Sequence, residues 1–112
     1  MDDKSFYEKL IKNNGVSTQM MKALEEITEL SEVIVKHYTK PEEFSGDNLR
    51  ELIVKEMSHC LMTFESLKVI FNISKDEIEK EINLKKKLIG WNNKSGNDDV
   101  ANKNFEDQED FA

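Results

Sequence analysis

The sequence predicts an all-α protein, a four-helix bundle whose core is completed by oligomerisation. Glycine and proline, which interrupt helices, are scarce, with 4 Gly and 1 Pro among 112 residues. Glu, Lys, Leu and Ile are abundant, a composition typical of amphipathic helices. A chain of this length buries only about two-thirds of its unfolded surface, so association with other copies is an expected way to finish its core.

The first predicted helix is short and the second is long. Phe6, Leu10 and Ile11 form an apolar stripe at helical spacing, and the turn-forming sequence at 13–15 ends it. Ser17 is the expected N-cap of the second helix, because its hydroxyl can accept a hydrogen bond from an unpaired backbone N–H. A seam for packing against another helix is predicted at Met20, Leu24, Ile27, Ser31 and Ile34.

A loop over residues 39–47, which contains Pro41, separates the second helix from the third. Asp47 or Asn48 is expected to cap the third helix, which runs to about Phe71. The apolar residues of this helix are spread widely enough to pack on more than one side: Leu49, Leu52, Ile53, Leu61, Phe64, Leu67 and Ile70.

The fourth predicted helix begins with a capping box. Ser74 is its N-cap, and Glu77 is the residue whose side chain can reach back to the N-cap backbone. The helix runs to about Ile89, and Gly90 is expected directly after its end, where a left-handed backbone favours glycine.

Charge and composition exclude several classes of function. Residues 1–91 form the predicted helical domain with a net charge of −3, and the other −4 lies in residues 92–112, an acidic tail expected to be disordered. The lack of a basic face argues against nucleic-acid binding.

No uncharged run approaches the ~20 residues needed to cross a membrane, and the polar N-terminal segment lacks the apolar region of a signal peptide. The single cysteine, Cys60, excludes an intrachain disulfide and is expected in the core, so a cytoplasmic protein is predicted.

Two polar clusters interrupt the apolar faces of the long helices. Glu25, Glu26 and Glu29 lie on the second helix, and Glu56 and His59 lie on the third, at spacings of three and four that share a helix side. If the two helices pack antiparallel, the clusters converge near mid-helix, where carboxylate oxygens would suit Mg²⁺. One stripe on the third helix is polar in its middle, which is typical of residues that line a pocket inside a bundle. It consists of Leu52, Glu56, His59, Thr63, Ser66 and Ile70.

A simpler interpretation is a solvated face with ordinary ion pairs along each helix. Lys22 would then pair with Glu26, and Glu56 with His59. His37, near a helix end, is interpreted as a surface residue favoured by the helix dipole rather than as a ligand. Spacing alone leaves both interpretations open.

Three segments resemble parts of a known enzyme family. Residues 19–30 resemble the EExxE motif of MazG-like nucleotide pyrophosphohydrolases. Residues 55–67 resemble the second motif of that family, ExxD, with its apolar continuation. Residues 78–88, which contain Lys85 and Lys87, are similar to the family's basic end. The likeness is greatest to small phage and prophage members.

The resemblance implies a bundle completed by dimerisation or tetramerisation, and Mg²⁺-dependent hydrolysis of a nucleoside triphosphate to the monophosphate and pyrophosphate. One glutamate of the first motif would orient or deprotonate the attacking water, so the implied catalytic residues are Glu25, Glu26 and Glu29. The implied metal ligands are Glu26, Glu29, Glu56 and His59. The implied contacts to the substrate phosphates are Lys85 and Lys87.

His59 stands where the family has an aspartate. An imidazole nitrogen is a poor ligand for Mg²⁺, so Mn²⁺ is the alternative metal. Two functions are therefore predicted. The first is a nucleoside triphosphate pyrophosphohydrolase. The alternative is a non-catalytic helical interaction or nucleotide-sensing module whose activity is lost or altered because of His59.

Overall fold

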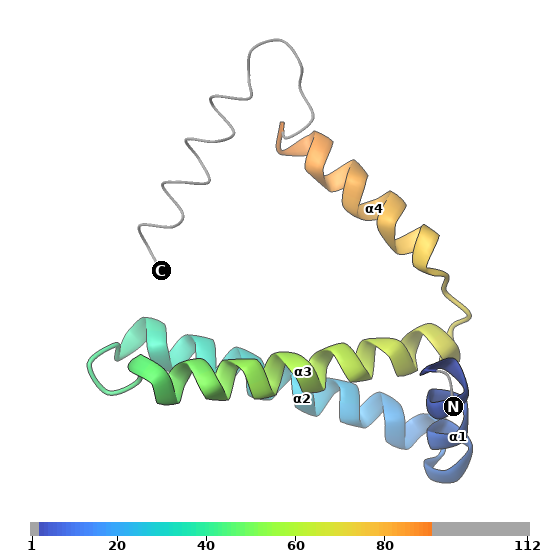
Figure 1. Cartoon of the computed structure of the whole chain (residues 1–112), viewed down its shortest axis with the longest axis horizontal. Helices are drawn as coiled ribbons and strands as arrows, with labels where there is room; N and C mark the ends of the chain where they lie inside the picture. The colour runs from blue at the N-terminus through green and yellow to red at the C-terminus, as the bar shows by residue number, and fades with distance from the viewer. Residues whose placement is uncertain (1–2, 91–112) are drawn as a thin grey trace. The chain divides into compact units, whose positions relative to one another are not determined.

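The computed structural model describes residues 3–90 and contains only helices in that part of the chain, which confirms the all-α class (Figure 1). The helices are α1 (Asp3–Asn14), α2 (Val16–Thr39), α3 (Gly46–Ile70) and α4 (Lys75–Leu88). The chain divides after Ile73 into a unit with α1, α2 and α3 and a unit with α4. The predicted tail at 92–112, and the domain boundary before it, lie outside the described residues.

Two predicted N-caps are wrong by two or three residues. Gly15 is the N-cap of α2 and has a φ of 93°, so the whole turn from α1 to α2 is made by one glycine and Ser17 lies inside the helix. Ser45 is the N-cap of α3. Asp47 therefore lies in the first turn of α3, where its carboxylate faces the positive end of the helix dipole.

The long helices α2 and α3 form an antiparallel hairpin, and α1 packs against both of them at the end away from the α2–α3 loop (Figure 1). Each long helix contributes a stripe of buried or half-buried positions at spacings of three and four, and on α3 the buried Ser66 lies beside the stripe. On α2 the stripe consists of Gln19, Ala23, Glu26, Leu30, Val33 and His37. On α3 it consists of Leu49, Ile53, Glu56, Cys60, Thr63, Leu67 and Ile70.

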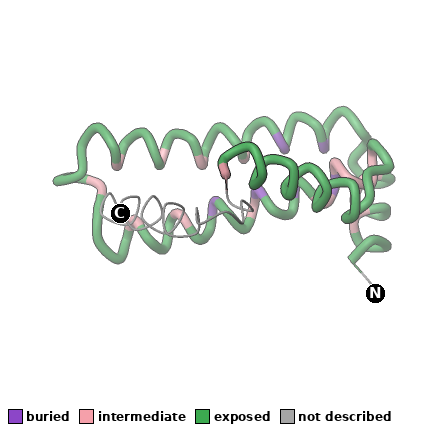
Figure 2. The backbone as a smooth tube through the Cα atoms, turned by 90° about the horizontal axis from the view of Figure 1, so that it is seen from above, coloured by how far each residue is buried: buried purple, intermediate pink, exposed green. Residues whose placement is uncertain are grey.

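The stripe of α2 is rotated by one residue from the predicted seam. Met20, Leu24 and Ile34 of that seam are 40%, 61% and 51% exposed, so the seam does not pack within the first unit. Small Ala23 lies on the inner stripe instead, where it is buried. Among the described residues, Ala23 and Cys60 are the only apolar residues that are fully buried, and Figure 2 shows how few positions are covered.

The first unit thus has a small core and a large exposed apolar surface. Exposed apolar residues also line the outer side of α3, among them Met57, Leu61 and Phe64. No helix within residues 3–90 combines the length and apolar character needed to span a membrane.

The capping box of α4 is confirmed. Ser74 Oγ accepts a hydrogen bond from the Glu77 backbone N–H at 3.1 Å, and Glu77 Oε2 accepts one from the Ser74 backbone N–H at 2.7 Å. At the other end Gly90 follows the C-cap with a φ of 81°, as expected.

Replacing Ser74 by alanine is expected to destabilise α4 by about 1 kcal/mol, because the Glu77 backbone N–H loses its hydrogen bond to Ser74 Oγ. Amide hydrogen exchange in the first turns of α4 would measure this as an increase of about fivefold. Ser58→Ala is the control, since Ser58 Oγ bonds only the Val54 carbonyl within α3. Equal exchange in α4 of the Ser74→Ala variant and the wild type would contradict the role of the cap.

The same cap makes α4 sensitive to acid. The backbone and side-chain hydrogen bonds from Ser74 lower the pKa of Glu77 below its ordinary value. A lowered pKa means that the stabilisation is present above the ordinary glutamate pKa and is lost as the pH falls through the pKa of the folded state. The protection of the α4 amides, relative to the intrinsic exchange rate at each pH, should therefore fall in acid, and Glu77→Gln should remove this part of the pH dependence.

Candidate metal centre

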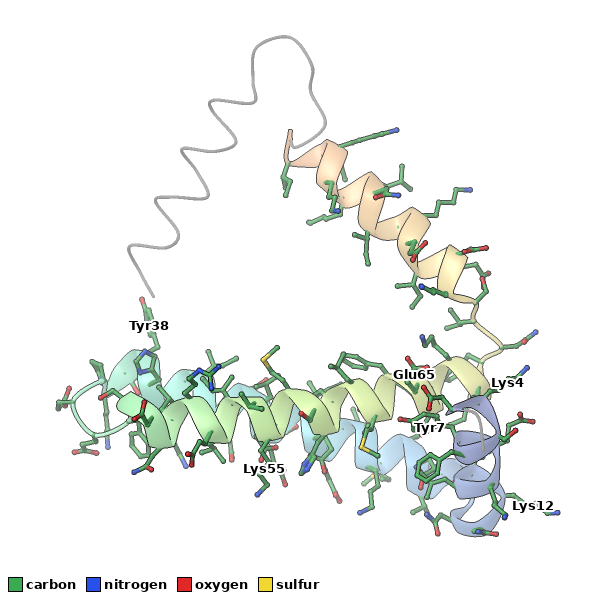
Figure 3. The ribbon with its side chains drawn as sticks, in the orientation of Figure 1. Lys4, Tyr7, Lys12, Tyr38, Lys55 and Glu65 are labelled. Carbon is green, nitrogen blue, oxygen red and sulfur yellow. The ribbon has the colours of Figure 1, made fainter. Side chains whose placement is uncertain are left out.

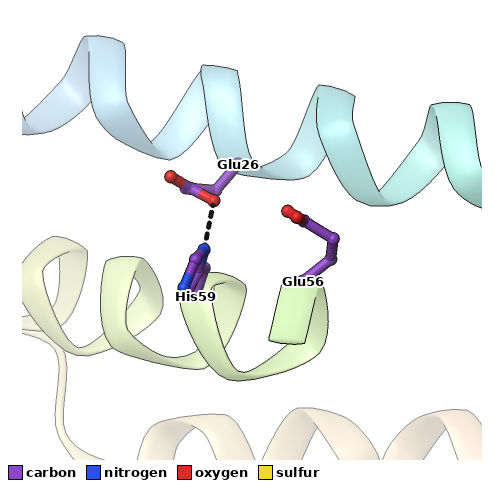
Figure 4. A group of neighbouring side chains, drawn as sticks. All are labelled: Glu26, Glu56 and His59. Atoms are coloured by element: carbon purple, nitrogen blue, oxygen red, sulfur yellow. Dashed lines mark hydrogen bonds and ion pairs between the residues drawn. The ribbon is translucent and has the colours of Figure 1, made fainter. Parts of the chain in front are cut away.

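Three side chains meet in the middle of the α2–α3 hairpin. Glu56 and His59 lie three residues apart on one side of α3, and Glu26 faces them from α2 (Figure 4). One oxygen or nitrogen atom of each residue lies within 4.8 Å of the others. Two carboxylates and an imidazole at this separation are a chemically plausible ligand set for a divalent metal.

Glu56 is the most unusual member of this cluster. Its side chain comes from the buried stripe of α3, and the residue is only 5% exposed. Its Oε2 atom is buried and accepts no hydrogen bond from the described residues. Burying a carboxylate oxygen without a partner is costly, and a cation beside this atom would lower that cost.

Glu26 and His59 are joined to each other. His59 Nδ1 donates to Glu26 Oε2 at 3.1 Å, and the contact becomes an ion pair when the imidazole is protonated. The partner of His59 is therefore a residue of the opposite helix and not Glu56, which the simpler interpretation had proposed. This bond keeps the imidazole and the α2 carboxylate within reach of Glu56.

Cys60 lies directly below the cluster, and its expected place in the core is confirmed. Its Sγ donates to the backbone carbonyl of Glu26 at 3.3 Å. Burial raises the pKa of the Cys60 thiol, and the negative charges of Glu26, Glu56 and Glu29 raise it further. The hydrogen bond from this thiol is a structural contact between the two helices.

The other predicted site residues of α2 lie outside the cluster. Glu25 and Glu29 are exposed and line a separate pocket on the helix surface, together with Leu24 and Glu32. A helix turns by about 100° per residue, so of the three glutamates only Glu26 falls on the stripe that faces α3. Glu29 is one turn from Glu26, and its charge still acts on the Cys60 thiol.

Two further predictions concern residues at helix ends. Lys85 and Lys87 are exposed in the last turn of α4, which belongs to the second unit. His37 was expected to be a surface residue, but it is half-buried at the end of the α2 stripe. Its Nδ1 donates to the backbone carbonyl of Phe44 at 2.6 Å and so ties the α2–α3 loop to α2.

A cleft of about 280 Å³ adjoins the cluster, with Glu26 and His59 in its wall. Thr63 and Ser66, from the stripe predicted to line a pocket, also belong to it. Sequence reasoning did not assign the other lining residues to a pocket, among them Tyr7 of α1 and Gln19 of α2. Figure 3 shows Tyr7 beside the C-terminal part of α3, near Glu65; burial, followed by the charges of Glu65 and Asp3, raises the pKa of the Tyr7 phenol. Gln19 could have been found from its position one turn before Ala23.

The fold and the cluster define a small all-α protein with a carboxylate–histidine cluster inside a helical hairpin. Comparisons of the chain with protein-family models, with curated proteins and with solved structures find no match. The cluster, the adjoining cleft and the motif-like segments are the features that bear on function.

Proposed function

We propose that this protein is a divalent-metal-dependent nucleoside triphosphate pyrophosphohydrolase, a MazG-like enzyme that releases pyrophosphate and a nucleoside monophosphate. The observation that carries the proposal is the buried, unpartnered Oε2 of Glu56, which lies in one cluster with Glu26 and His59. The resemblance of the segments around these residues to the EExxE and ExxD motifs supports it.

The donor set suits a metal softer than Mg²⁺. Glu26 and Glu56 offer oxygen atoms, which both Mg²⁺ and Mn²⁺ accept, while His59 offers a nitrogen atom that Mg²⁺ accepts poorly. Two carboxylates would balance the charge of a divalent cation, and the cation would satisfy Glu56 Oε2. Mn²⁺ is therefore the metal that we expect to support activity best, with Mg²⁺ as the second.

The bound metal would supply Lewis acidity toward the phosphates and lower the pKa of the attacking water. Glu26, Glu56 and His59 would hold it. Glu29 has no cross-helix partner among the described residues and lies one turn from Glu26, so we assign it the task of orienting or deprotonating the water. Phosphate contact by Lys85 and Lys87 rests on the motif resemblance.

We further propose that the protein acts as a homo-oligomer, a dimer or a tetramer, in the cytoplasm. The exposed apolar seam of α2 and the outer side of α3 supply the surface for association. A chain with a single cysteine that is buried as a free thiol is suited to a reducing compartment.

Pyrophosphate release from a panel of ribo- and deoxynucleoside triphosphates, with Mg²⁺ and separately with Mn²⁺, tests the proposal. We expect turnover with at least one substrate, and a loss of about 100-fold or more in Glu26→Gln, because one metal ligand is removed. Glu29→Gln should lower turnover while metal binding persists. The matched control is Glu32→Gln, an exposed glutamate of the same helix. A folded protein with no turnover on any substrate would overturn the enzyme proposal.

One observation favours the non-catalytic alternative. Glu26 and His59 already satisfy each other by a hydrogen bond, so part of the cluster is stable without a metal. A nucleotide-sensing or interaction module would bind metal or nucleotide without releasing pyrophosphate. Stabilisation by Mn²⁺ and nucleotide together with zero turnover would favour this alternative.

A further inference from the structure

The cleft beside the cluster has mostly apolar walls and several polar residues, among them Lys22, Thr63 and Gln19, which carries an amide group. Tyr7, Leu10 and Met62 supply an aromatic ring, an aliphatic group and a thioether. Gln19 is the residue with the amide, and it is only 4% exposed although it is polar. The volume of about 280 Å³ is just below the range of ordinary small-molecule sites, which suits a planar fragment better than a whole nucleotide.

The Gln19 amide is held in one orientation by α1. Gln19 Oε1 accepts a hydrogen bond from Asn14 Nδ2 at 3.1 Å, so the acceptor end of the amide is occupied. The Nε2 end carries two hydrogens and forms no hydrogen bond with the described residues. An oriented donor in a mostly apolar cleft will bind best to a ligand that presents an acceptor.

We infer that this cleft binds the nucleobase of the nucleotide, and that Gln19 selects a base with a ring carbonyl over one with an exocyclic amine at the same position. The inference rests on the proposed function, because the cluster that shares Glu26 and His59 with the cleft would hold the phosphates of the same nucleotide. Tyr7 and Met62 suit the face and edge of a planar heteroaromatic ring.

The selectivity follows from donor–acceptor matching. A base carbonyl accepts a hydrogen bond from Gln19 Nε2. An amine at that position places donor against donor and leaves two buried polar groups unpaired. Asn14 is the positioning residue, because its Nδ2 determines which end of the Gln19 amide faces the ligand.

Calorimetric binding of matched nucleoside monophosphates tests the inference without requiring turnover. Inosine monophosphate has a carbonyl at the purine position where adenosine monophosphate has an amine. Deoxyuridine and deoxycytidine monophosphates differ in the same way at one pyrimidine position. We expect about tenfold tighter binding of the carbonyl member of at least one pair. Gln19→Met, which removes the donor at similar volume, should abolish the preference.

Asn14→Asp provides a sharper test. An aspartate can only accept, so it would bind Gln19 Nε2 and turn Gln19 Oε1 toward the ligand. The preference should then reverse in favour of the amine bases. Asn13→Asp is the matched control: it makes the same substitution at the neighbouring exposed residue and should leave the preference unchanged.

The inference is wrong, whatever the enzyme assay shows, if the folded protein binds none of the four monophosphates. It is also wrong if the two members of each pair bind with equal affinity. Turnover of triphosphates at rates that ignore the carbonyl–amine difference also overturns it, and leaves the proposed function standing. A preference that reverses in Asn14→Asp supports the inference even if no pyrophosphate is released, in which case the pyrophosphohydrolase proposal alone fails.

Discussion

Glu56→Gln is expected to stabilise the metal-free protein by about 1–3 kcal/mol and, at the same time, to remove its stabilisation by Mn²⁺. Glu56 as a residue is 5% exposed, and its Oε2 has no partner among the described residues. An amide of nearly the same shape removes the cost of burying that charge. It also removes the negative charge that attracts the cation, so the two effects have opposite signs.

Urea unfolding with and without Mn²⁺ measures both effects. A metal at a hundredfold excess over its Kd should stabilise the wild type by about 2.7 kcal/mol. Glu51→Gln is the matched control, because Glu51 is an exposed glutamate of the same helix, and it should behave as the wild type. If Glu56→Gln lowers the metal-free stability and keeps the full response to Mn²⁺, Glu56 is a structural residue and not a ligand.

Leu24→Lys is expected to dissociate the oligomer, with an increase of about 30-fold or more in the dissociation constant. Leu24 is 61% exposed and lies on the seam of α2 that no part of the first unit covers. Partner helices that pack on this seam would bury the leucine. A lysine there would lose the apolar contact and would have to give up part of its hydration at the interface.

Light scattering over a range of concentrations tests this prediction against the 13.1 kDa mass of one chain. The wild type should show a multiple of that mass and Leu24→Lys a shift toward the single chain, with unchanged helix content by circular dichroism. Thr18→Lys adds the same charge to an exposed polar position of α2 and should remain associated. A monomeric wild type at all concentrations would contradict the predicted oligomer.

The sequence by itself was sufficient to predict the helices and several of their ends. The capping box at Ser74 and Glu77, and the glycine that follows α4, involve residues within a few positions of each other. Such signals are local, so they can be recognised in the sequence without any knowledge of the packing. The convergence of a glutamate of α2 with Glu56 and His59 could also be anticipated, because a short loop makes neighbouring helices antiparallel.

Only the tertiary structure decided which side of each helix faces inward. On α2 a seam at Met20 and Leu24 and a stripe at Gln19 and Ala23 have the same spacing, one residue apart. The single-residue rotation moves every side chain by about 100°. It brings Glu26 into the cluster, leaves Glu25 and Glu29 outside, and carries Gln19 into the cleft beside Tyr7. Periodicity determines that a helix has a face, but the face that is buried depends on the shape of the helix packed against it.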